Sequence, residues 1–180
     1  MTDHWIAVAL AKDIQRKPKR IMLAGQALVV FQGSDGPTAL LDLCPHRHAE
    51  LSQGRIIAGD IECPYHGWRF DGRGVCTAIP GSMDALPRYR VRRFRTLLQD
   101  GVVFVSQGDP DAPPYTHAAA GQDIVVRRVH SETRSTLIDT AENILDATHT
   151  HFTHKALLRG LSAKRHVVDV KVFGLSLIHI

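Results

Sequence analysis

Short apolar runs separated by turn-forming residues fill the first hundred residues of the chain. The turns are rich in glycine, aspartate and proline, as in Gly33-Ser-Asp-Gly36-Pro37 and Asp71-Gly-Arg-Gly74. Such spacing is typical of an antiparallel β-sandwich or β-barrel built from short strands. The strands that the pattern predicts span residues 27–31, 39–43, 56–57, 68–70, 75–79, 89–94 and 102–105.

The pattern changes in the second part of the chain. Between Gln107 and Gln122 the sequence is rich in glycine, aspartate, proline and alanine, a composition typical of a linker. From Asp139 to about Lys155, residues such as Ala141 favour a helix. The strands predicted around this helix span residues 124–129, 134–138 and 167–173. We therefore expect a β domain, a linker and part of a second domain that mixes helix and strand.

Composition and charge exclude several classes of protein. The chain has 180 residues, of which 44% are hydrophobic and 22% charged, which is ordinary for a globular protein. The formal net charge is only +4, and the basic residues are scattered apart from short runs at 16–20 and 88–95, so we expect no nucleic-acid partner. No apolar stretch is long enough to cross a bilayer, so we also expect no membrane insertion.

Histidine and cysteine are the unusual residues. The chain holds 11 histidines beside three cysteines, and no secretory leader is evident at the N-terminus. An odd number of cysteines without a leader indicates the reducing cytoplasm, where thiols serve metals or catalysis rather than disulfides. We therefore expect a cytoplasmic protein, and we interpret its histidines and cysteines together.

Two predicted loops each supply one cysteine and one histidine. Cys44-Pro-His46 is followed, after sixteen residues, by Cys63-Pro-Tyr-His66. Two cysteines and two histidines can hold a structural zinc ion, but zinc fingers usually group the cysteines together and the histidines together. The crossed arrangement suits a [2Fe–2S] cluster, in which two thiolates hold one iron and two imidazoles the other. A role without any metal fits two polar, proline-containing loops poorly.

The motifs around these residues resemble those of a known family. They read Cys44-Pro-His46-Arg47, Cys63-Pro-Tyr-His66-Gly-Trp68, Phe70-Asp-Gly-Arg-Gly and Ile79-Pro80-Gly81. Together they resemble the Rieske domain of the oxygenase type. The resemblance implies a mainly β domain with two cluster-binding loops, and a [2Fe–2S] cluster with four ligands: Cys44, His46, Cys63 and His66.

The sequence differs from the respiratory-chain Rieske type, which has an extra cysteine in each loop, joined as a disulfide. Ala49 and Tyr65 occupy those positions here, so the resemblance implies that this brace is absent. Trp68 stands where that type places a serine that donates a hydrogen bond to the cluster, which implies a potential toward the low end of the Rieske range. We expect His48 to be a surface or supporting residue and Cys76 a small buried hydrophobic residue.

A second group of metal-binding residue types follows the linker. It reads Glu142-Asn143-Ile-Leu-Asp146-Ala-Thr-His149-Thr-His151-Phe-Thr-His154. Asn143, Asp146 and His149 recur at three-residue steps, so they share one face of a predicted helix. Taken alone, the segment is also compatible with a solvated helix that carries incidental histidines.

This segment resembles the mononuclear iron motif of Rieske oxygenases, in the branch that contains vanillate O-demethylase and dicamba monooxygenase. The resemblance implies that His149 and His154 hold a mononuclear Fe(II), and that Asn143 and Asp146 have catalytic roles. The two histidines are five positions apart, which places them about 140° apart on a regular α-helix, so we expect a π-bulge or a kink between them. His151 is the rival to His149, because it would lie closer to His154 on a regular helix.

The chain is expected to be the N-terminal part of a longer protein. Non-haem Fe(II) oxygenases complete the iron site with a carboxylate, and nothing after His154 fits that role, since Asp169 lies in a strand-like segment. The resemblance implies an α+β helix-grip catalytic domain, of which this chain holds only the truncated start. The hexapeptide Leu175-Ser-Leu-Ile-His-Ile180 matches one reading frame of a sequencing-library adapter, so we expect the native sequence to end by about Gly174.

These inferences combine into one expected organisation. It consists of a Rieske domain over residues 1–108, a linker over 109–122, the start of the catalytic domain over 123–174 and an artefactual tail over 175–180. The segment Trp5-Ile-Ala-Val near the N-terminus also resembles the branch of monooxygenases named above.

The resemblance implies the oxygenase component of a monooxygenase or O-demethylase. A reductase or ferredoxin would bring electrons from NADH to the cluster, and the iron would use O₂ to hydroxylate or demethylate a small aromatic or related ring substrate. Family members form homotrimers in which the Rieske domain serves the iron of a neighbouring subunit, and an acid at the position of Asp146 bridges the two sites. Two alternatives remain: a Rieske-type ferredoxin, which residues 1–108 alone would fit, and a zinc-stabilised binding module.

Overall fold

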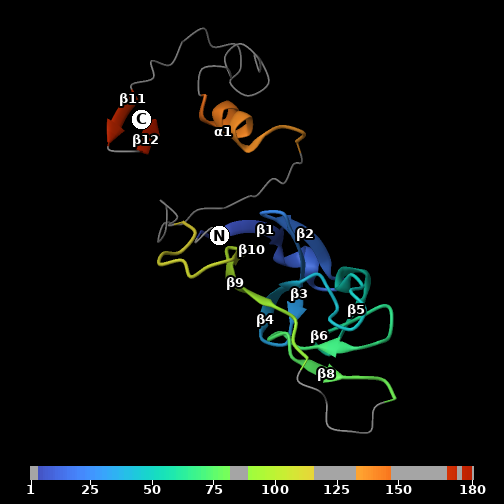
Figure 1. Ribbon diagram of the computed structural model, residues 1–180. Coiled ribbons are helices and arrows are strands. Elements are labelled where there is room, and N and C mark those ends of the chain that lie inside the picture. The colour runs from blue at the N-terminus through green and yellow to red at the C-terminus, as the bar shows by residue number, and fades with distance from the viewer. Residues whose placement is uncertain (1–3, 82–88, 116–132, 147–169, 174–175, 180) are drawn as a thin grey trace. The chain divides into compact units, whose positions relative to one another are not determined.

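The structure is a computed structural model of the chain, and it describes residues 4–81, 89–115, 133–146, 170–173 and 176–179. The chain divides into two compact units, Met1–Gln122 and Asp123–Ile180 (Figure 1). Each unit has its own strands, and the two Cys–His loops lie in the first unit.

A six-stranded antiparallel sheet forms the base of the first unit. Its strand order is β1-β10-β9-β4-β3-β2, so segments far apart in the sequence lie side by side where β1 meets β10 and where β4 meets β9. Its strands are β1 (Ile6–Leu10), β2 (Lys19–Leu23), β3 (Gln26–Gly33), β4 (Gly36–Leu41), β9 (Arg93–Gln99) and β10 (Val102–Ser106). The hairpins β2–β3 and β9–β10 turn at Ala24-Gly25 and Asp100-Gly101, whose positive φ angles match tight turns between antiparallel strands.

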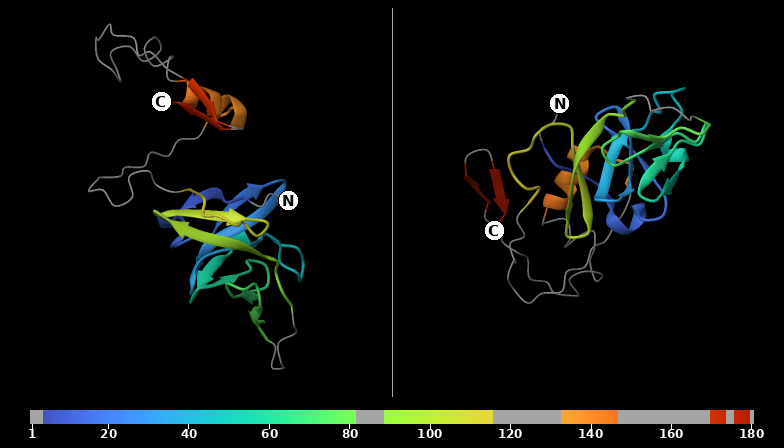
Figure 2. Two further views of the ribbon diagram at one scale, coloured as in Figure 1. Left: turned by 90° about the vertical axis from the view of Figure 1, so that its left-hand side faces the viewer. Right: turned by 90° about the horizontal axis from the view of Figure 1, so that it is seen from below.

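A second, four-stranded antiparallel sheet has the order β5-β6-β7-β8. Its short strands are β5 (Arg55–Ile57), β6 (Asp60–Glu62), β7 (Arg69–Phe70) and β8 (Cys76–Ala78). Figure 2 shows both sheets of this unit from two further directions. The second Cys–His loop connects β6 to β7, whereas the first follows β4 of the large sheet. The fold therefore brings one loop from each sheet to the site.

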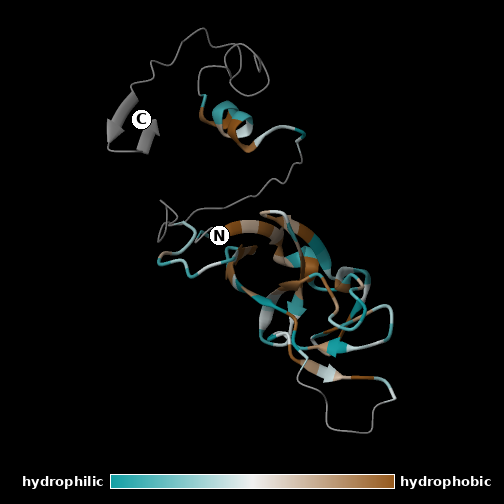
Figure 3. Ribbon diagram, in the orientation of Figure 1, coloured by the Kyte–Doolittle hydropathy of each residue, from teal (hydrophilic) through white to brown (hydrophobic). Residues whose placement is uncertain are grey.

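Strand β3 is buried on both faces because successive side chains of a strand point in opposite directions. Leu28 and Val30 belong to a core cluster within the large sheet, which also contains Ile14 of the 3₁₀-helix Ala11–Ile14. Val29 and Phe31 belong to a second cluster, which packs against the small sheet and contains the candidate ligand cysteines. Figure 3 shows the apolar character of β1 at the edge of this assembly.

The predicted mainly β, antiparallel fold is confirmed, with two corrections in this unit. The strand predicted over 89–94 begins only at Arg93, because the residues before it bond to the segment 74–76 instead. The Cys76 N–H donates to Tyr89 O, and the Val91 N–H donates to Gly74 O. Strand β6, in which Asp60 pairs with Ile57 of β5, was not among the predicted strands. Strands β1 and β2 were not among the predicted strands; both pair with strongly apolar neighbours.

The second unit contains helix α1 (Leu137–Leu145), where the strand prediction over 134–138 is wrong. Thr136 accepts a hydrogen bond from the Asp139 backbone N–H at 3.1 Å and so caps the helix start. The helix ends earlier than predicted, because Asp146 is the C-cap with ψ 95°. Beyond it, β11 (Val170–Phe173) pairs with β12 (Ser176–His179) in an antiparallel hairpin. The segments at 124–129 and 147–169 lie outside the described residues.

Helix α1 presents apolar side chains to solvent. Leu137 is 84% exposed and Ile144 75%, and none of the residues of α1 is buried. Figure 3 shows both apolar and polar positions on this helix, and the apolar residues recur at spacings of three and four, as expected for a helix that packs on one side. Across the part of the chain that the structure describes, no helix is long and apolar enough to span a membrane.

Candidate metal centre

The two Cys–His loops have the same backbone geometry. In the first loop the Cys44 N–H donates to Ala49 O at 2.9 Å, and the His48 N–H donates to Cys44 O at 2.8 Å. In the second the Cys63 N–H donates to Trp68 O at 2.8 Å, and the Gly67 N–H donates to Cys63 O at 3.0 Å. Each loop is thus a tight turn that starts at its cysteine and closes five residues later.

The fourth residue after each cysteine turns the chain back with a positive φ. This residue is His48 in the first loop, with φ 58°, and Gly67 in the second, with φ 72°. His48 is exposed and occupies the position of the turning glycine, which agrees with the expectation that it is a surface or supporting residue. The candidate ligand histidines stand earlier in the turn, at the second position for His46 and the third for His66.

The two thiols of the candidate site lie together in the core. Cys44 is 1% and Cys63 2% exposed, and the two side chains are within hydrogen-bonding reach of each other. Burial raises the pKa of the Cys44 thiol to about 11, although the backbone amides of His46 and Arg47 point at its sulfur and favour the thiolate. These amides form a ready set of donors for a metal-bound thiolate. Cys76 is also buried, as predicted, and its Sγ bonds to Ala78 O.

The two imidazoles of the candidate site lie together at the surface. The ring centroids of His46 and His66 are 4.6 Å apart, and both side chains are exposed. Partial desolvation lowers the pKa of His46, and the positive charges of His66 and Arg47 add to the effect. A neutral imidazole has a free nitrogen lone pair, which is the form that binds a metal.

A continuous row of aromatic rings extends from the imidazoles. Trp68 stacks on His46 with ring centroids 4.5 Å apart and an interplanar angle of 8°. Tyr89 in turn packs against Trp68, with ring centroids 5.1 Å apart. We call His46, Trp68 and Tyr89 the ring row. Because Trp68 belongs to the second loop and His46 to the first, the stack links the two loops through their side chains.

A buried carboxylate closes the base of the first loop. Both oxygens of Asp42 accept hydrogen bonds from Ser52, one from its backbone N–H and one from its hydroxyl, each at 2.7 Å. Arg20 lies 3.7 Å from the same carboxylate and forms an ion pair with Glu50, which lowers the pKa of Glu50. These contacts hold the ends of segment 42–52 together. This network was not predicted from the sequence, because nothing in the local pattern pairs Asp42 with Ser52.

An ion-pair ladder lies at the start of the second loop. Glu62 accepts from Arg55 Nε and from Arg69 Nε, each at 2.7 Å, across the neighbouring strands β5 and β7. The two guanidinium groups hold the pKa of Glu62 below its usual range, and the hydrogen bond from Arg69 has the largest effect. Glu62 immediately precedes Cys63, so the ladder positions the start of the loop.

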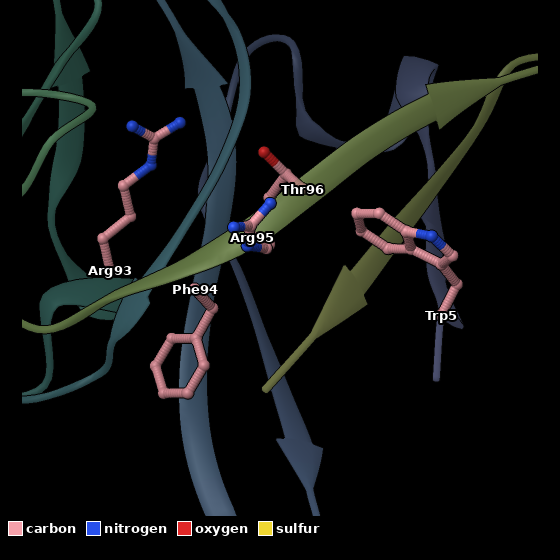
Figure 4. Close-up of a pocket in the computed structure, with 5 residues that line it drawn as sticks. All are labelled: Trp5, Arg93, Phe94, Arg95 and Thr96. Atoms are coloured by element: carbon pink, nitrogen blue, oxygen red, sulfur yellow. The ribbon is translucent and has the colours of Figure 1, made fainter. Parts of the chain in front are cut away.

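The cavity in Figure 4 is separate from this site. It measures about 390 Å³ and is lined by Trp5, Arg93, Phe94, Arg95 and Thr96, none of which belongs to either Cys–His loop. Two of its polar side chains are engaged already: Arg95 forms an ion pair with Asp109 at 2.9 Å, and Thr96 bonds to Pro37 O. Trp5 thus lines this cavity together with residues of β9.

The donor set fits two metal ions better than one. A tetrahedral zinc site draws all four donors to within about 2.0–2.3 Å of a single ion. Here the thiols pair with each other and the imidazoles pair with each other, one pair buried and the other exposed. Within the described ranges, no group of three or more such side chains surrounds one position. Two separate pairs match a [2Fe–2S] cluster, in which each iron takes one pair.

The candidate iron motif of the second unit is described only in part. Asn143 lies in the last turn of α1, and the Asp146 N–H donates to Glu142 O at 2.9 Å where the helix ends. The prediction that Asn143, Asp146 and His149 share one face of a continuous helix is wrong at Asp146, because its extended ψ takes the chain out of the helix. His149, His151, His154 and the bulge expected between them lie outside the described residues.

Comparison with known proteins agrees with the geometry of the first unit. The family described as Rieske [2Fe-2S] domain matches residues 4–91. The chain is 32% identical to the oxygenase component of dicamba O-demethylase from Stenotrophomonas maltophilia, over 86% of this chain and 48% of that protein. It is 33% identical to the oxygenase component of 3-ketosteroid-9-alpha-monooxygenase from Rhodococcus rhodochrous, over 83% of this chain and 41% of that protein.

A solved structure agrees as well. Apo dicamba monooxygenase matches with a TM-score of 0.56 and 37% identity, over 62% of this chain and 36% of that chain. Residues 4–91 are therefore a Rieske domain, and the chain is similar in sequence to the oxygenase components of dicamba O-demethylase and 3-ketosteroid-9-alpha-monooxygenase. It spans about half the length of the curated relatives that it matches. The predicted family resemblance is confirmed.

Proposed function

We propose that the chain is the electron-accepting part of a Rieske oxygenase component. Four residues of the two loops would hold the [2Fe–2S] cluster: Cys44, His46, Cys63 and His66. When bound, the cluster accepts and releases one electron at a time. The observation that carries the proposal is the pairing of two buried thiols with each other, and of two exposed imidazoles with each other, on loops of equal geometry.

The residues of the site have different roles. The backbone amides of His46 and Arg47 stabilise thiolate charge at Cys44 Sγ, while the core around the thiols excludes water. The exposed imidazoles leave an accessible edge, at which an electron leaves and a proton can be held or released. This arrangement directs electron exit through His46 and His66 toward a site outside the Rieske domain.

We extend the proposal to the motif after α1. His149 and His154, with a carboxylate from a part of the protein beyond this chain, would hold the mononuclear Fe(II) at which O₂ reacts. An aromatic or related ring compound is the proposed substrate, a reductase or ferredoxin using NADH the proposed electron source, and a homotrimer the proposed assembly. Asp146 would connect an imidazole of each metal site between neighbouring subunits, with Asn143 in support.

The primary test is spectroscopic. The purified chain is expected to be red-brown when oxidised and, after dithionite reduction, to give a rhombic EPR signal with an average g value below 2. A colourless protein that retains zinc, with no such signal after anaerobic cluster reconstitution, would contradict the proposal. In a full-length clone, Asp146→Asn is expected to leave both metals bound and to slow electron transfer between them; normal turnover would exclude the connecting role.

A Rieske-type ferredoxin is the second candidate function. It is favoured by the compactness of Met1–Gln122, which forms a contact unit of its own. Iron analysis of the full-length clone distinguishes the two: an oxygenase component binds three irons per subunit, and a ferredoxin two. The motif Glu142–His154 favours the oxygenase, because a ferredoxin has no use for it.

A further inference from the structure

The ring row provides a second connection between the cluster site and the surface. It begins at His46, passes through Trp68, which is only 9% exposed, and ends at Tyr89, which is 42% exposed. Conjugated rings in van der Waals contact couple electronically better than the same span of saturated chain. An electron donor seated over Tyr89 would therefore be coupled to a candidate ligand without covering the edge of His66.

The segment that carries Tyr89 is strongly basic. Arg90, Arg92 and Arg93 follow it, and all three are exposed. Arg92 lies over the ring of Phe94, 4.9 Å from its centroid, which holds this guanidinium group at the surface. The backbone of this segment is fixed by bonds to the turn before β8, including Val91 N to Gly74 O at 2.8 Å. The positive charges thus have a defined position beside the ring row.

These arginines differ in their partners from four other arginines of the unit. Arg20, Arg55, Arg69 and Arg95 each form an ion pair with a carboxylate. No carboxylate within the described ranges pairs with Arg90 or Arg92, nor with Arg47, which is next to His46 in the first loop. Unpaired surface charge of one sign attracts a partner of the opposite sign and accelerates its association.

We propose that Tyr89, Arg90 and Arg92 form the docking site of an acidic electron-transfer protein. The inference rests on the proposed function and names the partner of the same site. One electron leaves the reduced iron–sulfur centre of the donor, which is oxidised, and reaches the cluster held by this chain, which is reduced; no bond forms or breaks. Entry along the ring row to His46 and exit through the edge of His66 would let the cluster serve two partners in turn.

The test uses the full chain with its cluster and a reduced, acidic plant-type [2Fe–2S] ferredoxin as the probe. Stopped-flow absorption gives the rate of cluster reduction as a function of ionic strength. The double variant Arg90→Gln/Arg92→Gln is expected to slow reduction at low salt by about tenfold, and the difference should shrink in high salt as the charges are screened. Calorimetry with the oxidised ferredoxin should show a parallel loss of affinity.

A matched control removes the same charge elsewhere. Arg16 and Lys17 are exposed cations in the loop between the first 3₁₀-helix and β2, and no carboxylate within the described ranges pairs with them. Arg16→Gln/Lys17→Gln is expected to change the rate less than twofold at the same salt concentration. Equal effects of the two double variants would overturn the docking site, since net charge alone would explain them.

Tyr89 variants test the ring row separately from docking. Tyr89→Phe keeps the ring and should retain the rate of electron transfer at saturating ferredoxin, whereas Tyr89→Leu should lower that saturated rate severalfold. Equal rates for the two variants would overturn the role of the ring row. Dithionite reduction and the EPR signal should be the same in all variants, which shows that the cluster is intact.

Other outcomes are also decisive. A wild-type cluster that dithionite reduces and the ferredoxin does not would overturn the inferred class of partner, while the proposed function would stand. If the arginine variants change the sedimentation of the protein instead of its reduction, this surface contacts a second copy of the chain, and the inference is wrong. Absence of any [2Fe–2S] signal would instead contradict the proposed function itself.

Discussion

The indole of Trp68 lies parallel to the imidazole of His46, with ring centroids 4.5 Å apart and an angle of 8° between the planes. The two residues come from different loops and from different sheets of the Rieske domain. Backbone bonds close each loop separately, for example between Cys63 and Trp68. The stack therefore links the loops to each other and fixes the plane of a candidate metal ligand.

The stack makes a direct prediction for Trp68. Trp68→Leu removes the stack and leaves space in the core, so the free energy of unfolding should fall by about 2–4 kcal/mol and cluster content should drop. Trp68→Phe keeps a ring and should retain more of both. Iron and sulfide content per chain and urea unfolding measure the two quantities. Equal cluster content in the two variants would show that the ring does not hold His46.

His48 offers a test of the ligand assignment in the first loop. Its φ of 58° is strained for a residue with a side chain, and glycine takes the equivalent position in the second loop. His48→Gly should therefore keep the cluster and change the unfolding free energy by less than about 1 kcal/mol. His46→Ala serves as the comparison and should abolish the rhombic EPR signal. Loss of the signal in His48→Gly would reverse the assignment.

Gly67 combines a positive φ with a close approach. A Cβ at this position would lie 2.9 Å from Cγ of Pro80, whereas a Cβ at Gly25, which also has a positive φ, would meet nothing within 4 Å. Gly25→Ala should cost about 1–2 kcal/mol of unfolding free energy from the backbone alone. Gly67→Ala should cost more and also lower cluster content, because the loop must move. Thermal unfolding of both variants separates the cost of the positive φ, which both share, from the cost of the contact with Pro80, which only Gly67→Ala makes.

The Asp42–Ser52 contact predicts a loss of stability that is local to the first loop. Ser52→Ala removes the hydroxyl that donates to Asp42 and leaves a buried carboxylate oxygen without its 2.7 Å partner. The free energy of unfolding should fall by about 1–3 kcal/mol. Ser34→Ala is the control, since that hydroxyl makes only an exposed bond of 3.2 Å to Ala58 O. An equal loss in both variants would contradict the role given to Asp42.

The ladder around Glu62 predicts a dependence of stability on pH. Because Arg69 and Arg55 lower the pKa of Glu62 in the folded state, its contribution is full above the unfolded pKa and is lost as pH falls through the folded pKa. Unfolding free energy should therefore be constant above about pH 5 and decrease as the pH falls below the unfolded pKa of about 4.3. Glu62→Gln should decrease less over this range. Urea unfolding at each pH, followed by circular dichroism, measures the difference, and parallel curves would exclude the effect.

The sequence by itself determined the class of site. Cysteine and histidine alternate in two proline-containing loops, and that pattern depends on residue identity and spacing, which are local properties. The same locality explains why most short strands, such as β3 and β10, were predicted, since their apolar runs lie between glycine-rich turns. It also explains the error at 134–138, where the capping bond of Thr136 outweighed the strand preference of the residues around it.

Only the tertiary structure decided what surrounds the site. Asp42 meets Ser52, Trp68 meets His46 and Tyr89 meets Trp68 because two sheets pack around a common core, and no local pattern encodes such contacts. Packing also set which donors are buried and which are exposed, since the thiols point into the core and the imidazoles lie at its rim. Burial and contact depend on residues distant in the sequence, so they follow from the fold as a whole.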